Sequence, residues 1–164
     1  MKKFFLLAVI GVLAASTAWG ATITITANAA PILDVSVSTS AWTIALDNSG
    51  DAFTNDAQGA FTVKASKSAY TVTFSSGNNG VLKSTGADTI PYKIKVDTTG
   101  WSAGVNTNNL SSYTQLVTAK TITFKSKTPT GGKTFNIGFG IDAYSDYYID
   151  GAYTDTLTIT IAAP

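Results

Sequence analysis

The sequence predicts an all-β fold in which two antiparallel sheets pack face to face as a sandwich. Apolar residues recur at every second position in segment after segment, and no stretch beyond the N-terminal leader places them at helical spacing. Clusters of Gly, Asn, Asp and Ser separate these segments, as turns between strands do. About eight to ten half-buried strands need a partner surface for their apolar faces, and a two-sheet sandwich provides one.

Strands are expected where the alternation is most regular. In chain order, the clearest runs contain these apolar residues: Ile23, Ile25 and Ala27; Leu33, Val35 and Val37; Trp42, Ile44 and Leu46; Tyr70, Val72 and Phe74; Ile90, Tyr92, Ile94 and Val96; Phe135, Ile137, Phe139 and Ile141; and Leu157, Ile159 and Ile161. Weaker runs contain Phe61 with Val63 and Ile122 with Phe124. The mostly polar stretch from Thr98 to Ser112 predicts the longest loop.

The start of the chain predicts an export signal rather than part of the fold. Lys2 and Lys3 precede an apolar run that begins at Phe4, and small residues follow at Ala18 and Gly20. The run has about 12 residues, fewer than the roughly 20 that a membrane-spanning helix needs. We therefore expect residues 1–20 to be a cleaved signal peptide, residues 21–30 an N-terminal strand, and residues 31–164 a single β-sandwich domain with no membrane span after cleavage.

The composition argues against several functional classes. Cleavage would remove Lys2 and Lys3 but none of the ten acidic residues, so the exported chain is nearly neutral. Because it lacks Arg to read bases and has no cationic surplus, a nucleic-acid partner is not expected. It also lacks His, Glu and Cys, which most often act as general bases or nucleophiles, so we expect neither an enzyme nor a cofactor site. Without Cys, stability has to come from the apolar core.

One acidic stretch is a weak candidate for metal binding. Asp142, Asp146 and Asp150 offer the hard oxygen ligands that calcium prefers, but their spacing does not match a calcium-binding loop, and solvated turn carboxylates are the favoured interpretation. The tyrosines of residues 144–148 are interleaved with polar groups. Such rings suit a sugar-binding or protein-contacting surface, although the favoured interpretation is that two of them fill the core.

The two ends of the exported chain carry its most informative pattern. Residues 22–27 alternate Thr with Ile or Ala and lead to Ala29-Ala30-Pro31-Ile32-Leu33-Asp34. The chain closes with Gly151-Ala152-Tyr153 and the alternation of Leu157, Ile159 and Ile161. This pair of ends resembles the subunits of chaperone-usher pili, in particular alternate-chaperone pilins and the related spore coat protein U-like domains. Between the ends, only the general sandwich pattern is shared.

The resemblance implies an immunoglobulin-like sandwich that lacks one strand, and a structural role in a surface fibre (a pilus or fimbria) or coat. In such pilins the N-terminal strand of one subunit fills the gap in its neighbour, which is β-strand addition between subunits. The implied subunit interface consists of Ile23, Ile25 and Ala27 on the donor side and Tyr153, Leu157 and Ile159 on the acceptor side. The resemblance also implies a periplasmic chaperone and an usher as partners, and passage through the periplasm to the cell surface or the medium.

Two alternatives stay open at this point. Residues 22–28 would pair within their own domain if the protein is a self-contained extracellular binding or adhesive domain, and the sequence does not separate pairing in cis from pairing in trans. A small outer-membrane barrel also follows a signal and alternates apolar with polar residues. Several runs here have only about five residues, shorter than the nine to eleven of a membrane-spanning strand, so the barrel is the lesser alternative.

Overall fold

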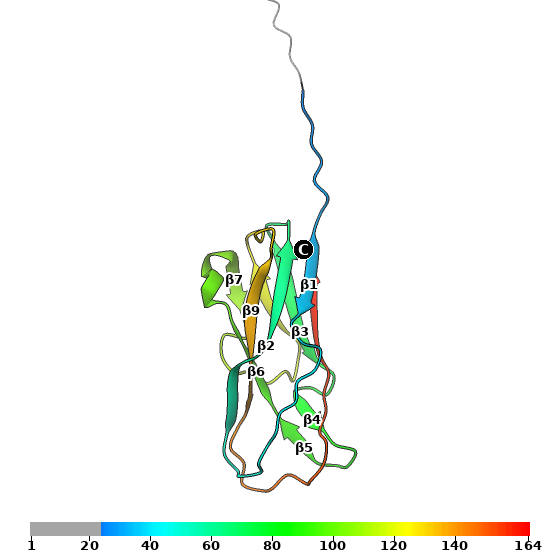
Figure 1. Ribbon diagram of the computed structural model, residues 1–164, viewed down its shortest axis with the longest axis vertical. Coiled ribbons are helices and arrows are strands. Elements are labelled where there is room, and N and C mark those ends of the chain that lie inside the picture. The colour runs from blue at the N-terminus through cyan, green and yellow to red at the C-terminus, as the bar shows by residue number, and fades with distance from the viewer. Residues whose placement is uncertain (1–23) are drawn as a thin grey trace, which may run out of the picture.

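The computed structural model describes residues 24–164, and from residue 33 onward the chain forms an all-β sandwich, as the sequence predicts (Figure 1). The strands are β1 (Leu33–Val37), β2 (Phe53–Ala65), β3 (Tyr70–Ser76), β4 (Val81–Lys83), β5 (Thr89–Pro91), β6 (Lys93–Asp97), β7 (Val105–Asn108), β8 (Lys120–Phe124), β9 (Lys133–Ile141) and β10 (Leu157–Ala162). A short 3-10 helix, η1, spans Thr99–Gly104. The expected signal peptide, residues 1–20, lies outside the described residues.

The sandwich consists of two four-stranded antiparallel sheets. One sheet has the strand order β1-β2-β9-β6 and the other has the order β10-β3-β8-β7. The short strands β4 and β5 pair with each other in a small separate sheet. β1 and β10 are edge strands of different sheets, and they lie close together along one side of the molecule (Figure 1). Two sheet edges that are distant in sequence therefore meet on this side.

The core between the sheets is built from the alternating apolar side chains. The ring of Phe61 in β2 packs edge to face on Phe74 in β3, with 5.3 Å between the ring centroids, and so joins the two sheets. Phe61 also lies 5.3 Å from Phe135 in β9. Burial of each large apolar side chain contributes about 1.5–3 kcal/mol. The buried cluster thus provides the stability that a chain without cysteines needs.

The structure corrects the long loop expected between residues 98 and 112. This stretch contains η1 and β7, and Leu110 is fully buried. Trp101 stacks on Phe124 of β8 with 5.8 Å between the ring centroids. A Cβ atom at Gly104 would lie 2.3 Å from the Trp101 ring, so glycine permits this close packing. The sequence gives no sign of β7 because the strand has four residues and none of them is fully buried.

Two other expected strands also differ from the structure. The segment containing Trp42, Ile44 and Leu46 keeps its alternation, with these side chains half-buried and their neighbours exposed, but it belongs to no strand. The run expected over residues 90–96 is divided at Tyr92, because β5 pairs with β4 whereas β6 pairs with β9. Alternation reports which side chains are buried, and it does not report which backbone groups are paired.

Residues 24–32, which we call the N-terminal segment, lie outside the sandwich. They are exposed and form no strand, so the strand expected over residues 21–30 is not seen for the residues that the structure describes. The segment leaves the body beside β1 and points away along the long axis (Figure 1). Ile32 ties its end to the body, since the Ile32 carbonyl accepts a hydrogen bond from the Ser66 N–H at 2.9 Å. Among the described residues, no helix has the length and apolarity to cross a membrane.

Candidate functional site

A groove of about 380 Å³ runs along the side where β1 and β10 meet, and we call it the edge groove. It lies between the segment that follows β1 and the chain that leads into β10. Its apolar lining consists of Val37, Ala41, Trp42, Ile44, Ala60, Leu82, Tyr92, Ile137, Phe139, Tyr153, Leu157 and Ile159. An apolar hollow bordered by two sheet edges has the character of a binding site for an extended chain.

Backbone groups along the β10 flank of the edge groove are free to pair. β10 has β3 as its only hydrogen-bonded neighbour among the described strands. The Gly77 N–H donates to the Thr156 carbonyl at 2.9 Å, which makes Thr156 a hydrogen-bonded position of this antiparallel ladder. Because such positions alternate, the N–H and C=O groups of Leu157, Ile159 and Ile161 point away from β3 toward the open edge.

The opposite flank also carries unpaired backbone. β1 ends where the Ser38 N–H donates to the Ala60 carbonyl at 2.9 Å. From residue 39 to residue 49, the described chain forms no hydrogen bond between backbone groups. Trp42 and Ile44 hold this segment in place through side-chain packing against the core. The edge groove is therefore flanked on both sides by backbone that a further strand could satisfy.

The floor of the edge groove is aromatic. Phe139 of β9 contacts Trp42 edge to face, with 6.4 Å between ring centroids, and stacks on Tyr92 at 5.3 Å. Trp42 lies against Gly59, which follows an irregularity in the pairing of β2 with β9. A Cβ atom at Gly59 would lie 2.5 Å from the indole. Glycine at this position lets the indole approach the sheet and form one wall of the groove.

Asp155 fixes the chain where it enters β10. Its carboxylate accepts hydrogen bonds from the Tyr92 hydroxyl at 2.6 Å, from the Asn78 N–H at 2.9 Å and from the Ser76 hydroxyl. Burial, together with the hydrogen bond to Asp155, raises the pKa of Tyr92 above its usual range. The Tyr92 hydroxyl donates to the Asp155 carboxylate and holds the start of β10 beside the groove floor.

Asp88 fixes Tyr153, which lies two residues before Asp155 in the chain that leads into β10. The Asp88 carboxylate accepts hydrogen bonds from the Ile149 N–H at 3.0 Å and from the Tyr153 hydroxyl at 2.8 Å. These two hydrogen bonds, the first having the larger effect, lower the pKa of Asp88. Desolvation and the hydrogen bond to Asp88 raise the pKa of Tyr153 to about 12. Tyr153 thus presents a fixed ring to the groove.

The structure brings the three expected acceptor residues to one place. Tyr153, Leu157 and Ile159 are half-buried and all line the edge groove. On the donor side, Ala27 is exposed, and the Ile25 side chain is 88% exposed on the N-terminal segment. The third donor residue, Ile23, lies outside the described residues.

The weak metal candidates are not gathered into a site. Within residues 24–164, no three side chains of the metal-ligating types lie close enough together to hold an ion. Asp142 instead forms an ion pair with Lys93. Asp146 and Asp150 are exposed on the loop that follows β9.

The tyrosines on this loop differ from the favoured interpretation. None of them is fully buried, and of the three only Tyr148 packs against the core, as a half-buried side chain. Tyr144 and Tyr148 are half-buried and pack on each other, with 4.4 Å between ring centroids. Tyr147 is 81% exposed. The side chain of Asn48 donates to the Tyr148 carbonyl at 2.8 Å and ties this loop to the turn before β2.

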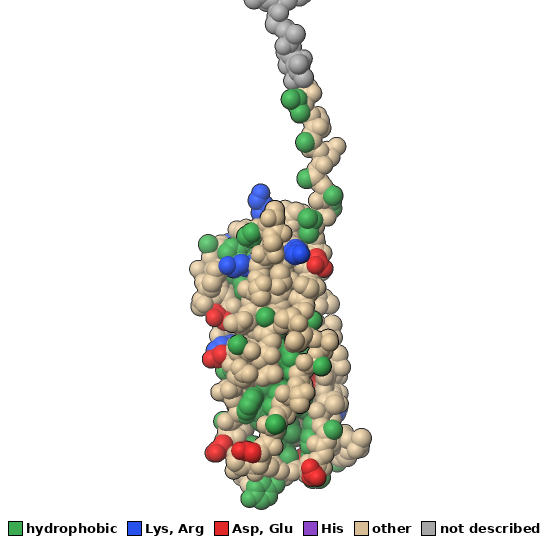
Figure 2. Space-filling model, in the orientation of Figure 1, with side chains coloured by type: hydrophobic (Ala, Val, Ile, Leu, Met, Phe, Trp, Pro, Cys, Tyr) green, Lys and Arg blue, Asp and Glu red, His purple; other side chains and the backbone are tan. Residues whose placement is uncertain are grey.

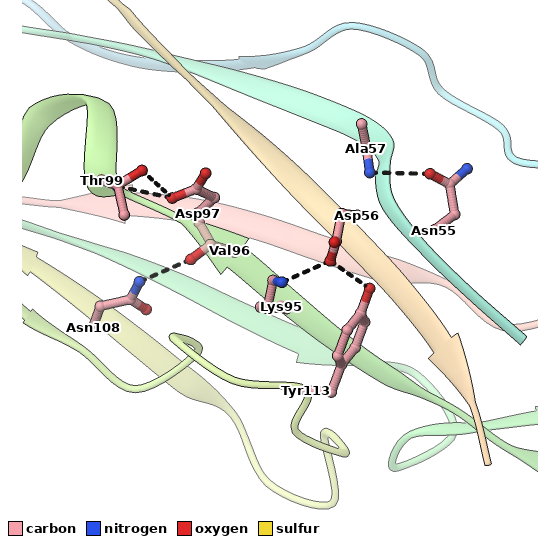
Figure 3. A network of polar contacts seen from close by, with 9 residues as sticks. All are labelled: Asn55, Asp56, Ala57, Lys95, Val96, Asp97, Thr99, Asn108 and Tyr113. Carbon is pink, nitrogen blue, oxygen red and sulfur yellow. Dashed lines mark hydrogen bonds and ion pairs between the residues drawn. The ribbon is translucent and has the colours of Figure 1, made fainter. Parts of the chain in front are cut away.

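A second polar cluster lies over the sheet that contains β2, β9 and β6 (Figure 3). Asp56 accepts hydrogen bonds from the Lys95 ammonium at 2.6 Å and from the Tyr113 hydroxyl at 2.8 Å. These interactions, with Lys95 first, lower the pKa of Asp56. A Cβ atom at Gly140 would lie 3.2 Å from the Tyr113 ring, so the ring sits directly on β9. Because the three polar groups satisfy one another, the cluster fastens the loop before β8 to the sheet.

Several groove residues escaped the sequence analysis. Trp42, Tyr92 and Phe139 alternate as core residues do, and periodicity does not separate a groove floor from a closed core. Asp155 has the appearance of an ordinary turn residue. Its position directly before the alternation of β10 is the one signal that could have singled it out.

Comparisons with known proteins leave the structure as the guide to function. No model of a known protein family matches the sequence, and a search of curated proteins found no match. The fold and the edge groove together define the class of the molecule. Over the described residues, it is a β-sandwich with an apolar groove between the free edge of β10 and the segment that follows β1.

Proposed function

We propose that the protein is a structural subunit of a secreted surface fibre or coat, assembled when the N-terminal segment of one copy fills the edge groove of the next. One observation carries the proposal: an exposed segment with an apolar alternation and an unfilled groove with free backbone on both flanks occur in the same chain. In an isolated subunit, both the segment and the groove are unfavourable, because they expose apolar surface and unpaired strand backbone to water. Strand addition between copies would cover both.

The dimensions of the two partners agree. Residues 22–28 span about 24 Å when extended, and the groove flank from Tyr153 to Ile159 has the same number of residues. Burial of the Ile25 side chain would contribute about 1.5–3 kcal/mol. Each hydrogen bond to the free backbone groups of Leu157 and Ile159, which line the groove, would add about 0.5–1.5 kcal/mol.

The arrangement also favours a fibre over a closed dimer. The N-terminal segment points away from its own body along the long axis (Figure 1), whereas the edge groove lies on the side of the sandwich, between residues 37–44 and 153–159. Contacts between two different surfaces of identical subunits are head to tail and propagate unless the rotation closes a ring. During export the open groove needs temporary cover, which is the role we assign to a periplasmic chaperone, with an usher ordering the assembly.

Deletion of residues 21–29 from the exported chain tests this function. Because residues 24–30 are exposed, we expect the truncated domain to fold with a free energy of unfolding within about 0.5 kcal/mol of the full chain. We expect it to stay monomeric where the full chain polymerises. Circular dichroism and urea titration measure folding, and sedimentation measures assembly. A truncated domain that unfolds, or one that polymerises like the full chain, contradicts the proposal and favours a self-contained domain.

A further inference from the structure

The two ends of the sandwich carry opposite charge. We call the end where the N-terminal segment leaves the basic end, and the opposite end the acidic end; Figure 2 shows cationic side chains gathered at the first and anionic ones at the second. The basic end carries Lys64, Lys67, Lys125, Lys127 and Lys133. The acidic end carries Asp47, Asp51, Asp142, Asp146 and Asp150.

Strand topology accounts for this separation. The connections formed by residues 66–69 and 125–132 both lie at the end where β1 begins, because β1 starts opposite the end of β2 and β3 starts opposite the end of β8. The loop after β9, residues 142–152, and the turn at residues 47–51 lie at the other end, since β2 starts opposite the end of β9. The lysines and aspartates of these connections are thus held at opposite ends of the long axis.

Within the described residues, most of these charges form no ion pair. In the part of the chain that the structure describes, Asp142 alone among the ten residues forms an ion pair, with Lys93. Asp34 and Asp97 near the basic end, and Lys83 near the acidic end, reduce the charge of each end without reversing it. Each end therefore presents a net charge to an approaching molecule.

Exposed apolar side chains accompany the charges. Tyr147 and Ile149 at the acidic end are 81% and 69% exposed, and Ile32 at the basic end is 53% exposed. Aromatic and aliphatic side chains within a charged rim are typical of protein contact surfaces. The two ends thus complement each other in charge and both offer apolar surface.

We propose that the acidic end of one copy binds the basic end of the next copy. The partner is a second copy of this chain because the complementary surfaces are the opposite ends of a single molecule. The step that links this contact to the edge groove rests on the proposed function. Residues 29–32 join a donated strand to β1, and four residues reach at most about 14 Å. The basic end of the donor must therefore lie beside the point where its segment leaves the groove.

The charges select the direction of the donated strand. β10 runs from the acidic end to the basic end, where the C-terminus lies (Figure 1). A donated strand antiparallel to β10 leaves the groove at the acidic end and brings opposite charges together. A strand parallel to β10 would leave at the basic end and set two basic ends against each other, which Coulomb repulsion disfavours. A donated strand that runs antiparallel to β10 is thus the one that also places the basic end of the donor against the acidic end of the acceptor.

Charge reversal at each end tests the contact. One variant carries Lys67→Asp and Lys127→Asp, a second carries Asp146→Lys and Asp150→Lys, and a third combines all four substitutions. None of these side chains forms a hydrogen bond or ion pair in the described chain, so folding should be unchanged, as checked by urea titration. Light scattering at low salt should show each two-residue variant assembling at least tenfold more slowly than wild type. The four-residue variant, in which the ends are again complementary, should recover most of the rate.

Salt provides a second readout. Since the screening length shrinks from about 30 Å at 0.01 M to about 3 Å at 1 M, wild-type assembly should slow at least tenfold over this range. If neither salt nor charge reversal changes the rate of assembly, the contact between the two ends is overturned. It is also overturned if the four-residue variant assembles no faster than the two-residue variants. If deletion of residues 21–29 alone blocks assembly, strand donation stands and the end contact fails. If reversal changes assembly but the deletion does not, strand donation fails and the end contact stands. A wild-type chain that stays monomeric at low salt overturns both.

Discussion

A synthetic peptide with the sequence of residues 21–29, added to the domain that lacks them, is expected to bind in the edge groove. At a concentration about one hundred times its dissociation constant, a ligand that binds only the folded state raises the free energy of unfolding by about 2.7 kcal/mol. The side chain of Ile25 is almost fully exposed in the free segment and would become buried. Replacing Ile25 by Ala in the peptide therefore removes most of about 1.5–3 kcal/mol, or roughly ten- to hundredfold in affinity.

Trp42 gives this binding a direct readout. It lines the edge groove, whereas Trp101 packs elsewhere, against Phe124. In a Trp101→Phe background of the domain that begins at residue 30, Trp42 is the sole tryptophan, and its fluorescence should change as the peptide fills the groove. The matched control is a Thr26→Ala peptide, because residue 26 faces away from the groove in the same strand and should alter affinity less than threefold. Equal affinities for the Ile25→Ala and unmodified peptides, or binding without a Trp42 signal, would refute the register and the site.

Three further predictions concern the stability of the domain, each measured by urea titration. The Tyr70 hydroxyl is buried without a hydrogen-bond partner, so Tyr70→Phe should leave the free energy of unfolding unchanged or raise it by about 1 kcal/mol. Tyr92→Phe removes a donor to Asp155 and should lower the free energy of unfolding by about 1–2 kcal/mol. Equal effects of the two substitutions would contradict the assigned contacts. Asp155→Ala should lower it by about 1.5–3 kcal/mol, and the control Asp150→Ala should change it by less than about 0.5 kcal/mol; matching losses would show that Asp155 is not an anchor. Burial raises the pKa of Tyr70 to about 12, above its value in the unfolded chain. The folded state therefore keeps the Tyr70 proton to higher pH, and the free energy of unfolding should fall as pH rises from about 10 to 12. A Tyr70→Phe variant whose free energy of unfolding depends on alkaline pH in the same way would contradict this.

Alternation in the sequence is enough to predict the fold class and most of the core. Phe61, Phe74 and Phe135 lie at alternating positions of their segments, and the structure buries all of them between two sheets. The same rule fails for β7, which is short and carries no fully buried side chain. It also fails at residues 42–46, where burial alternates without a neighbouring strand.

The edge groove itself depends on information that periodicity does not carry. Its two flanks come from residues 37–44 and 153–159, and only the strand order places these distant segments side by side. The resemblance of the chain ends to pilins predicts an acceptor role for Tyr153, Leu157 and Ile159, and all three line the edge groove. Asp155 gains its role from Tyr92, which lies far away in sequence.

The flank formed by residues 39–49 also has a consequence for the width of the edge groove. Backbone amides that are bonded to no other backbone group exchange their hydrogens through low-energy local openings, whereas those in the ladder between β2 and β9 exchange only when the sheet opens. This wall can therefore shift inward or outward without breaking a ladder. The opposite wall, β10, is held by its ladder with β3. The segment of residues 39–49 is therefore the side that can move toward an inserted chain and adapt to side chains of different size.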